Sequence, residues 1–210
     1  MDPTLAQKLS DLEEEALLDA VRRELAAGVP AAAILDACRE GMLAVGKRYE
    51  TGEYFVSDLM MAGEVFKQAT ALLGDQLKAS DAPPKGVLVI GTVAGDIHDI
   101  GKDLVVTMLR TAGYQVVDLG VDVPTEKFVD AVKQSGATVA GLSGLLTVGY
   151  DSMRATVQAL KATGLPIKVM IGGGPVNETV CEYTGADAFG QDAQAAVALA
   201  DQWTQLKEVA

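Results

Sequence analysis

The sequence is short of aromatic residues and of cations. Aromatic side chains make up 5% of the 210 residues, which leaves little material for the stacking surfaces that bind single-stranded nucleic acid. The 17 Lys and Arg are outnumbered by 29 Asp and Glu, and the resulting formal net charge of −12 repels phosphate backbones and anionic lipids. These shortages argue against nucleic acid and against a membrane surface as partners.

Long apolar runs and paired cysteines are missing as well. No apolar stretch approaches the ~20 residues that cross a bilayer, and the N-terminus, MDPTLAQKLSDLEEE, has no basic region followed by an apolar core. The two cysteines, Cys38 and Cys181, match no spacing that is typical of a metal or redox site. We therefore expect a cytoplasmic protein with two structural thiols.

The composition of the chain changes near residue 80. Residues 1–84 hold six Gly and six Val or Ile, whereas residues 85–210 hold sixteen Gly and twenty-four Val or Ile. The first composition is typical of helices, and the second of buried strands joined by tight turns. Because the stretch Ser80-Asp81-Ala82-Pro83-Pro84 terminates helices, we expect a helical domain at 1–82 and an α/β domain at 85–210.

The first part carries apolar residues at helical spacing. One amphipathic helix is expected from Leu12 to Leu25, with Gly28 just beyond its end, and Pro30 can open a second. Ser57 is expected to cap the N-terminus of a third long helix. We expect three or four helices packed in a small bundle.

The second part alternates strand and helix signals in five βα units. Short apolar strands joined by helical crossovers imply a parallel sheet that is covered on both faces. Right-handed crossovers favour a doubly wound, flavodoxin-like (Rossmann-like) order, 2-1-3-4-5, and such sheets bind ligands beyond the carboxyl ends of their strands. The strands are expected at 86–93, 114–120, 137–143, 167–174 and 186–189.

Three loops would meet at that edge of the sheet. The first strand runs into Asp96-Ile97-His98-Asp99-Ile100-Gly101, which contains the only histidine of the chain. The third strand ends in Ser143-Gly144-Leu145-Leu146-Thr147, and the fourth ends in Gly172-Gly173-Gly174. Singly, each loop has an ordinary explanation, namely a hydrogen-bonded histidine, an N-capped turn or a tight glycine turn. Together they place a nitrogen ligand, hydroxyl groups and bare backbone in one crevice.

The spacing of these motifs resembles a known signature. Between Gly101 and Ser143 lie 41 residues, and between Leu145 and Gly172 lie 26. Asp-x-His-x-x-Gly, Ser-x-Leu and Gly-Gly at this spacing resemble the cobalamin-binding signature of corrinoid-dependent methyltransferases and mutases, including methionine synthase. The segment 49–62 is similar to the helical cap of small corrinoid proteins from methanol, methylamine and aryl methyl ether (O-demethylase) methyltransferase systems.

The resemblance implies a role for each matched residue. His98 would be the lower axial ligand of the cobalt and Asp96 its hydrogen-bond partner, so that the pair takes part in catalysis. One position departs from the methionine synthase pattern, because Gly149 stands where a second serine extends the proton relay, and the extent of that relay stays open. The remaining contacts to the corrinoid would come from Asp99, Ile100, Gly101, Ser143, Leu145, Thr147, Gly172, Gly173 and, in the cap, Phe55.

The resemblance also implies a function. A helical cap and a cobalamin domain without a substrate domain are similar to non-catalytic corrinoid carrier subunits. Such a carrier accepts a methyl group on cob(I)alamin from a substrate-specific methyltransferase, holds it as methylcobalamin, and delivers it to a second methyltransferase that uses tetrahydrofolate or a thiol. A reductive activase would rescue oxidised cobalt. The methyl donor and acceptor stay open.

Two other classes of cobalamin protein are weighed against the carrier. The alternative is the small cobalamin-binding subunit of an adenosylcobalamin-dependent mutase, but such subunits generally lack the helical cap. A cobalamin sensor that controls transcription would normally add a basic DNA-reading module. Residues 1–84 hold 8 Lys and Arg against 15 Asp and Glu, a net charge of −7, and so offer no such module.

Overall fold

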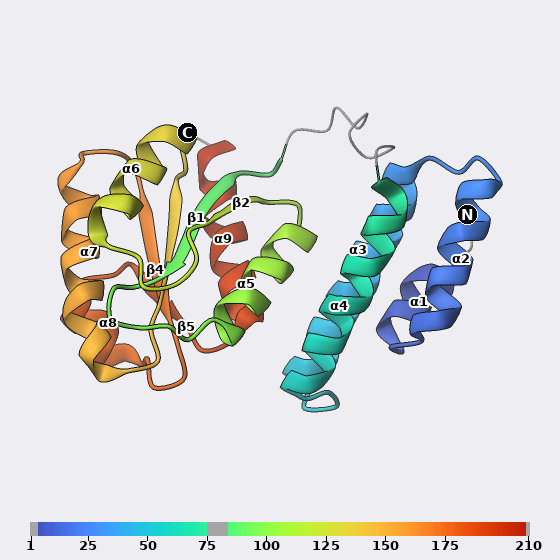
Figure 1. Cartoon of the computed structure of the whole chain (residues 1–210), viewed down its shortest axis with the longest axis horizontal. Helices are drawn as coiled ribbons and strands as arrows, with labels where there is room; N and C mark the ends of the chain where they lie inside the picture. The colour runs from blue at the N-terminus through green and yellow to red at the C-terminus, as the bar shows by residue number, and fades with distance from the viewer. Residues whose placement is uncertain (1–3, 75–83, 209–210) are drawn as a thin grey trace. The chain divides into compact units, whose positions relative to one another are not determined.

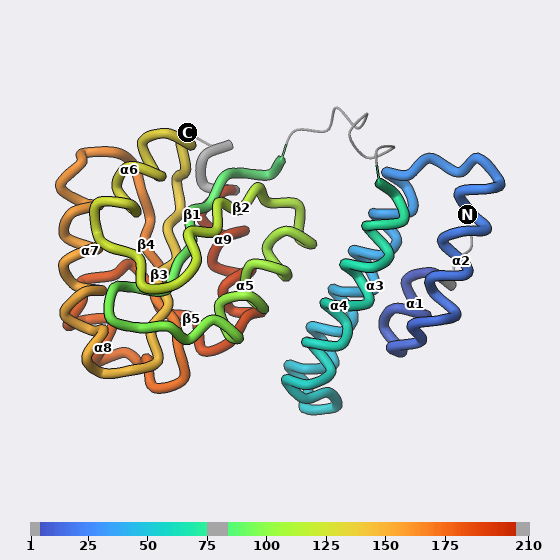
Figure 2. Tube along the Cα trace, viewed as in Figure 1, coloured from blue at the N-terminus to red at the C-terminus, as the bar shows by residue number. Residues whose placement is uncertain are grey.

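The computed structural model describes residues 4–74 and 84–208, which fall into two compact units that divide between Pro83 and Pro84 (Figures 1 and 2). We call them the helical unit and the α/β unit. Apart from Pro84, the linker expected at 80–84 lies outside the described residues. No helix in the described ranges combines the length and the apolar character needed to cross a membrane.

The helical unit is a bundle of helices around an apolar core. The long helices α3 and α4 pack against each other, and α1 packs against α3. Gly41 of α3 lies so close to α1 that a Cβ atom there would be 2.7 Å from the carbonyl oxygen of Ala6. The four helices of its described residues are α1 (Thr4–Ser10), α2 (Glu14–Ala26), α3 (Ala31–Glu50) and α4 (Val56–Leu73).

Two helix starts differ from the sequence-based expectation. Leu12 does not belong to α2, because it has a positive φ of 61° in the turn that separates α1 from α2. The prediction that Ser57 caps α4 was wrong. Phe55 is the N-cap and the helix begins at Val56, two residues before the start that a Ser57 cap implies. The carboxylate of Asp58 accepts a hydrogen bond from the backbone N–H of Phe55 at 2.7 Å. Asp58 in the first turn thus bonds the N–H of the cap residue, whereas a serine cap would accept an N–H from within the first turn.

The α/β unit is built on a parallel sheet of five strands in the order β2-β1-β3-β4-β5, which confirms the expected flavodoxin-like topology. Apolar residues of α6, α7 and α8 pack on one face, and those of α5 and α9 pack on the other (Figure 1). The strands are β1 (Val87–Thr92), β2 (Gln115–Asp118), β3 (Val139–Ser143), β4 (Lys168–Gly172) and β5 (Ala188–Gly190).

The helices of this unit follow the strands as crossovers. All four strand pairs are parallel, so every connection has to return along the sheet before the next strand begins. This topology brings the ends of β1, β3 and β4 to one edge. The helices are α5 (Ile100–Thr111), α6 (Thr125–Ser135), the short 3₁₀ helix η2 (Thr147–Gly149), α7 (Tyr150–Ala162), α8 (Glu178–Thr184) and α9 (Ala193–Glu208).

Candidate functional site

The loop between β1 and α5 holds a histidine and a carboxylate in direct contact. The ring Nδ1 of His98 lies 2.6 Å from Oδ1 of Asp96, and the backbone N–H of His98 donates to the same oxygen at 3.0 Å. The side chain of Asp96 is fully buried, whereas that of His98 is 47% exposed. This geometry engages Nδ1 and leaves Nε2 as the ring nitrogen that an incoming ligand can reach.

The second oxygen of Asp96 ties this loop to the loop that follows β3. Its Oδ2 accepts hydrogen bonds from the backbone N–H groups of Leu145 at 2.6 Å and Leu146 at 2.9 Å. Burial would raise the pKa of Asp96, but the bonds from Leu146, His98 and Leu145 outweigh it and hold the pKa well below its usual range. Asp96 is therefore an ionised hub that joins two of the three loops singled out from the sequence.

Small residues form a row across the carboxyl edge of the sheet. Thr92 of β1 pairs with Ser143 of β3, Ser143 pairs with Gly172 of β4, and Gly172 pairs with Gly190 of β5. Residues in one row of a parallel sheet point to the same face. We call these four residues the edge row. Gly190 was not singled out from the sequence, because its place becomes apparent only in the strand register.

The glycines of the site differ in what surrounds them. A Cβ atom at Gly173 would lie 2.0 Å from the carbonyl oxygen of Gly144, and its φ of 140° is one that other residues rarely adopt. At Gly172 the nearest atom would be the carbonyl oxygen of Gly190 at 3.6 Å, and at Gly101 no atom would lie within 4 Å. The fold itself therefore requires Gly173, whereas space is open beside Gly101 and Gly172.

The other residues expected in the α/β site lie at the same edge. Asp99 is exposed just before α5, and its carbonyl accepts a hydrogen bond from the N–H of Asp103 at 2.7 Å. Thr147 is exposed in η2. Several large apolar side chains are also exposed on these loops and on neighbouring helix starts, as expected of a binding surface. They are Ile97, Ile100, Leu145, Leu146 and Val148.

In the helical unit, Phe55 is exposed instead of lying in the bundle core. The residue is 70% accessible, and Met60 and Met61 on α4 are exposed as well. Tyr54 is held differently, because its hydroxyl donates to the carbonyl of Ser10 at 2.7 Å and accepts from Arg48. The described bundle therefore exposes large apolar side chains at and just before the start of α4.

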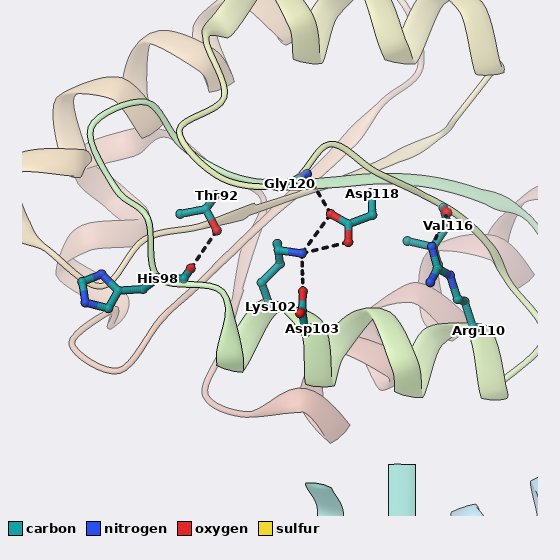
Figure 3. A network of polar contacts seen from close by, with 8 residues as sticks. All are labelled: Thr92, His98, Lys102, Asp103, Arg110, Val116, Asp118 and Gly120. Atoms are coloured by element: carbon teal, nitrogen blue, oxygen red, sulfur yellow. Dashed lines mark hydrogen bonds and ion pairs between the residues drawn. The ribbon is translucent and has the colours of Figure 1, made fainter. Parts of the chain in front are cut away.

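Three polar residues beside the site were not singled out from the sequence, namely Thr92, Lys102 and Asp118 (Figure 3). The side chain of Lys102 is 2% exposed, and its Nζ lies 2.9 Å and 2.8 Å from the two carboxylate oxygens of Asp118. One signal was available, because Lys102 stands four and seven residues before the buried Val106 and Leu109, on what is otherwise an apolar helix face.

Comparison with known proteins identifies relatives of both units. A family model described as B12 binding domain matches residues 86–200, and a second with the same description matches residues 3–73. Dimethylamine corrinoid protein 2 of Methanosarcina mazei is 38% identical over 205 residues, which cover 94% of this chain and 96% of that protein.

Two solved structures are similar over nearly the whole chain. A novel cobalamin-binding protein from Desulfitobacterium hafniense is 44% identical, with a TM-score of 0.77 and coverage of 96% of this chain and 97% of that one. A chain of the methanol:cobalamin methyltransferase complex from Methanosarcina barkeri is 28% identical, with a TM-score of 0.82 and coverage of 96% and 78%. The chain belongs to the family of B12-binding corrinoid proteins.

Proposed function

We propose that this protein is a corrinoid methyl carrier, and that it holds the corrinoid through His98. The observation that carries the proposal is the contact of 2.6 Å between Nδ1 of His98 and the buried carboxylate of Asp96. A carboxylate on one ring nitrogen fixes the tautomer and raises the basicity of the other, which is the arrangement found behind metal-bound histidines. Imidazole nitrogen is a suitable ligand for cobalt.

The residues around His98 fit a corrinoid with a long nucleotide tail. The open space beside Gly101 and Gly172 allows a planar group to pass close to the backbone. Ser143, which pairs with Gly172 across β3 and β4, adds a hydroxyl. The exposed apolar side chains at the loops suit the rim of a large macrocycle. We propose that Asp99, Ile100, Leu145, Thr147 and Gly173 complete the walls of this site.

When bound, the corrinoid supplies a cobalt atom that can accept a methyl group and give it up. His98 would hold the cobalt through Nε2, and Asp96 keeps the imidazole in place through Nδ1. Gly149 faces Asp96, since a Cβ atom there would lie 4.0 Å from Oδ2, and it brings no hydroxyl to the pair. Any proton exchange of the pair must therefore use water or another residue.

We propose that the helical unit is the cap over the upper face of the corrinoid, with Phe55 as its main contact. The exposure of Phe55, Met60 and Met61 supports this, because large apolar side chains on a surface commonly mark a binding site. The match of residues 3–73 to a B12 binding model also supports it. The cap favours the carrier over the mutase subunit that the sequence left open.

The proposed partners are two methyltransferases. The names of similar proteins point to methylamines or methanol as sources of the methyl group, since one relative is a dimethylamine corrinoid protein and another belongs to a methanol:cobalamin methyltransferase complex. The acceptor is tetrahydrofolate or a thiol on a second methyltransferase. We further propose an aryl methyl ether demethylase as an alternative donor system, a reductive activase as a transient partner, and a cytoplasmic location.

Labelling of the histidine tests the cobalt ligand, because the chain contains only one. The protein is reconstituted with cobalamin, reduced to the Co(II) state and examined by electron paramagnetic resonance, with natural-abundance and ¹⁵N-labelled histidine. We expect the triplet splitting from axial ¹⁴N to become a doublet with the label. The His98→Ala variant should lose that coupling. An unchanged triplet would mean that the corrinoid's own base stays on the cobalt and would overturn His98 as ligand.

Methyl loading tests the carrier function separately. The reconstituted protein is reduced to the Co(I) state and treated with methyl iodide, and its visible spectrum is recorded before and after exposure to a thiol acceptor with and without a methyltransferase. We expect stoichiometric loading and enzyme-dependent unloading. A protein that binds corrinoid through His98 but cannot be loaded would contradict the carrier function alone.

A further inference from the structure

Thr92 holds the histidine loop through a backbone atom of His98 that Asp96 does not contact. Thr92 is the last residue of β1 and is fully buried, and its Oγ1 donates a hydrogen bond to the backbone carbonyl of His98 at 2.9 Å (Figure 3). Its own backbone is fixed to the loop after β2, since its N–H donates to Gly120 and its carbonyl accepts from Val123. The hydroxyl is therefore rigidly placed under the histidine.

The buried ammonium group of Lys102 forms an ion pair with the more accessible Asp118 near Thr92 (Figure 3). Lys102, in the first turn of α5, binds both carboxylate oxygens of Asp118, and Oδ1 of Asp118 also accepts from the N–H of Gly120 at 3.0 Å. Gly120 in turn accepts the N–H of Thr92 at 2.9 Å. The loop from Thr92 to α5 is thus fixed at both ends, because the helix start is bonded to the same strand end that supports Thr92 (Figure 3).

These contacts account for every polar group of His98 except one. The backbone N–H and the ring Nδ1 of His98 both meet Asp96, and its backbone carbonyl meets Thr92. Only Nε2 is left without one of these protein contacts. Three anchored atoms on one residue define the direction in which the fourth points, and a metal ligand needs that direction to be set before the metal arrives.

We propose that Thr92 is a positioning residue for His98. In this proposal the Lys102–Asp118 pair keeps the Thr92 hydroxyl within hydrogen-bond distance of the His98 carbonyl. The inference rests on the proposed function, since it treats His98 as the ligand of cobalt. Thr92 does not touch the corrinoid in this proposal. Its hydroxyl acts through the His98 carbonyl, and it determines how much of the bound corrinoid carries the histidine on its cobalt.

The apoprotein gives the first readout, because its single histidine yields one imidazole signal in a nuclear magnetic resonance spectrum. The untagged chain is labelled with ¹⁵N-histidine, and the hydrogen-bonded Nδ1 proton is observed in wild type, Thr92→Val and Thr92→Ser. We expect a sharp, downfield Nδ1 proton in wild type and Thr92→Ser. In Thr92→Val we expect the signal to broaden or move toward the free imidazole value. Wild-type spectra from all three proteins would overturn the proposal.

The reconstituted protein gives the second readout. In the Co(II) state, we expect Thr92→Val to lower the ratio of histidine-bound to histidine-free cobalt by about tenfold, with recovery in Thr92→Ser. Thr111→Val is the matched control, because it removes another buried threonine hydroxyl that donates to a backbone carbonyl, that of Thr107 at 2.9 Å. A merely structural effect would change both variants alike and would overturn the proposal.

The outcomes separate this inference from the proposed function. If wild type itself shows no coupling to ¹⁵N-histidine, His98 is not the ligand and the proposed function fails at that point. If wild type shows the coupling and Thr92→Val keeps it in full, only the positioning by Thr92 fails. Should Thr92→Val not fold, Thr92→Ala replaces it in both measurements, with the same expected and contradicting results.

Discussion

Replacing Gly173 with alanine is expected to lower the free energy of unfolding of the α/β unit by about 4 kcal/mol, whereas the same change at Gly172 is expected to cost less than about 1 kcal/mol. The two glycines are adjacent, so the comparison isolates their surroundings. At Gly173 the new Cβ would overlap the carbonyl oxygen of Gly144 at 2.0 Å, and the φ of 140° would have to change. At Gly172 the nearest atom is 3.6 Å away.

Urea unfolding of the two apoproteins measures this difference. The only tryptophan of the chain, Trp203, packs against the core of the α/β unit, so its fluorescence reports that unit. We expect a lower midpoint for Gly173→Ala and a nearly unchanged midpoint for Gly172→Ala. Equal losses in both variants would contradict the distinction between a glycine that the fold needs and one that lines open space.

Gly172→Ala, the variant expected to stay stable, should nevertheless retain less cobalamin. If the nucleotide tail passes beside Gly172, a methyl group there removes space that the tail needs, and we expect weaker retention of cobalamin by a well-folded Gly172→Ala protein. The measurement is the fraction of cobalamin that stays with the protein after gel filtration. Full retention by Gly172→Ala would remove Gly172 from the proposed walls of the site.

The topology of the α/β unit could be predicted from the sequence because local and long-range signals agree. Runs of Val and Ile mark buried strands, the crossovers are long enough for helices, and handedness then permits few strand orders. The same logic brings the loops that contain His98, Ser143 and Gly172 to one edge. The structure places all three loops there and adds that the buried carboxylate of Asp96 bonds two of them together.

The support of the site could not be predicted in the same way. The bond from Thr92 to the His98 carbonyl depends on a loop conformation, and the pairing of Lys102 with Asp118 joins the start of α5 to the end of the next strand, β2. A threonine at a strand end and a lysine in a helix are common residues with many possible uses. Strand register and side-chain direction decide between these uses, and neither can be read from spacing.

Phe55 and Gly173 show two further limits of sequence reasoning. An apolar residue near a helix start is more often packed than exposed, yet Phe55 is 70% accessible. In the Gly-Gly pair, the sequence offers no means to tell which glycine serves the fold. The structure shows that the fold needs a glycine at 173, because a Cβ atom there would overlap the backbone oxygen of Gly144 and because φ is 140°.

Replacing Asp96 with asparagine is expected to destabilise the apoprotein by about 3 kcal/mol at pH 7. The buried carboxylate faces donors on both sides, namely the N–H and ring Nδ1 of His98 at Oδ1 and the N–H groups of Leu145 and Leu146 at Oδ2. An amide offers one oxygen, and its NH₂ group would point at donors on the other side. The variant should also lose the sharp Nδ1 proton of His98.

The matched control is Asp122→Asn in the neighbouring loop. Asp122 uses Oδ1 to accept one hydrogen bond, from the N–H of Gly95 at 2.8 Å, and an asparagine can make the same bond. Its positive φ of 50° is also one that asparagine tolerates. We therefore expect a change within about 0.5 kcal/mol, measured by the same urea unfolding. A loss as large as that of Asp96→Asn would mean that any change near these loops destabilises the unit.

Acid should diminish the difference between wild type and Asp96→Asn. The hydrogen bonds hold the pKa of Asp96 below its ordinary value, so folding favours the ionised form. The stabilisation from this depressed pKa is complete above the ordinary aspartate value of about 3.9, and it is lost as the pH falls through the lower folded-state value. The gap in midpoint should therefore be constant from pH 7 to about pH 5 and narrow below about pH 4. A difference in urea midpoint that stays constant to pH 3 would mean that the charge of Asp96 contributes nothing to stability. The loss in Asp96→Asn would then come from packing and not from the charge.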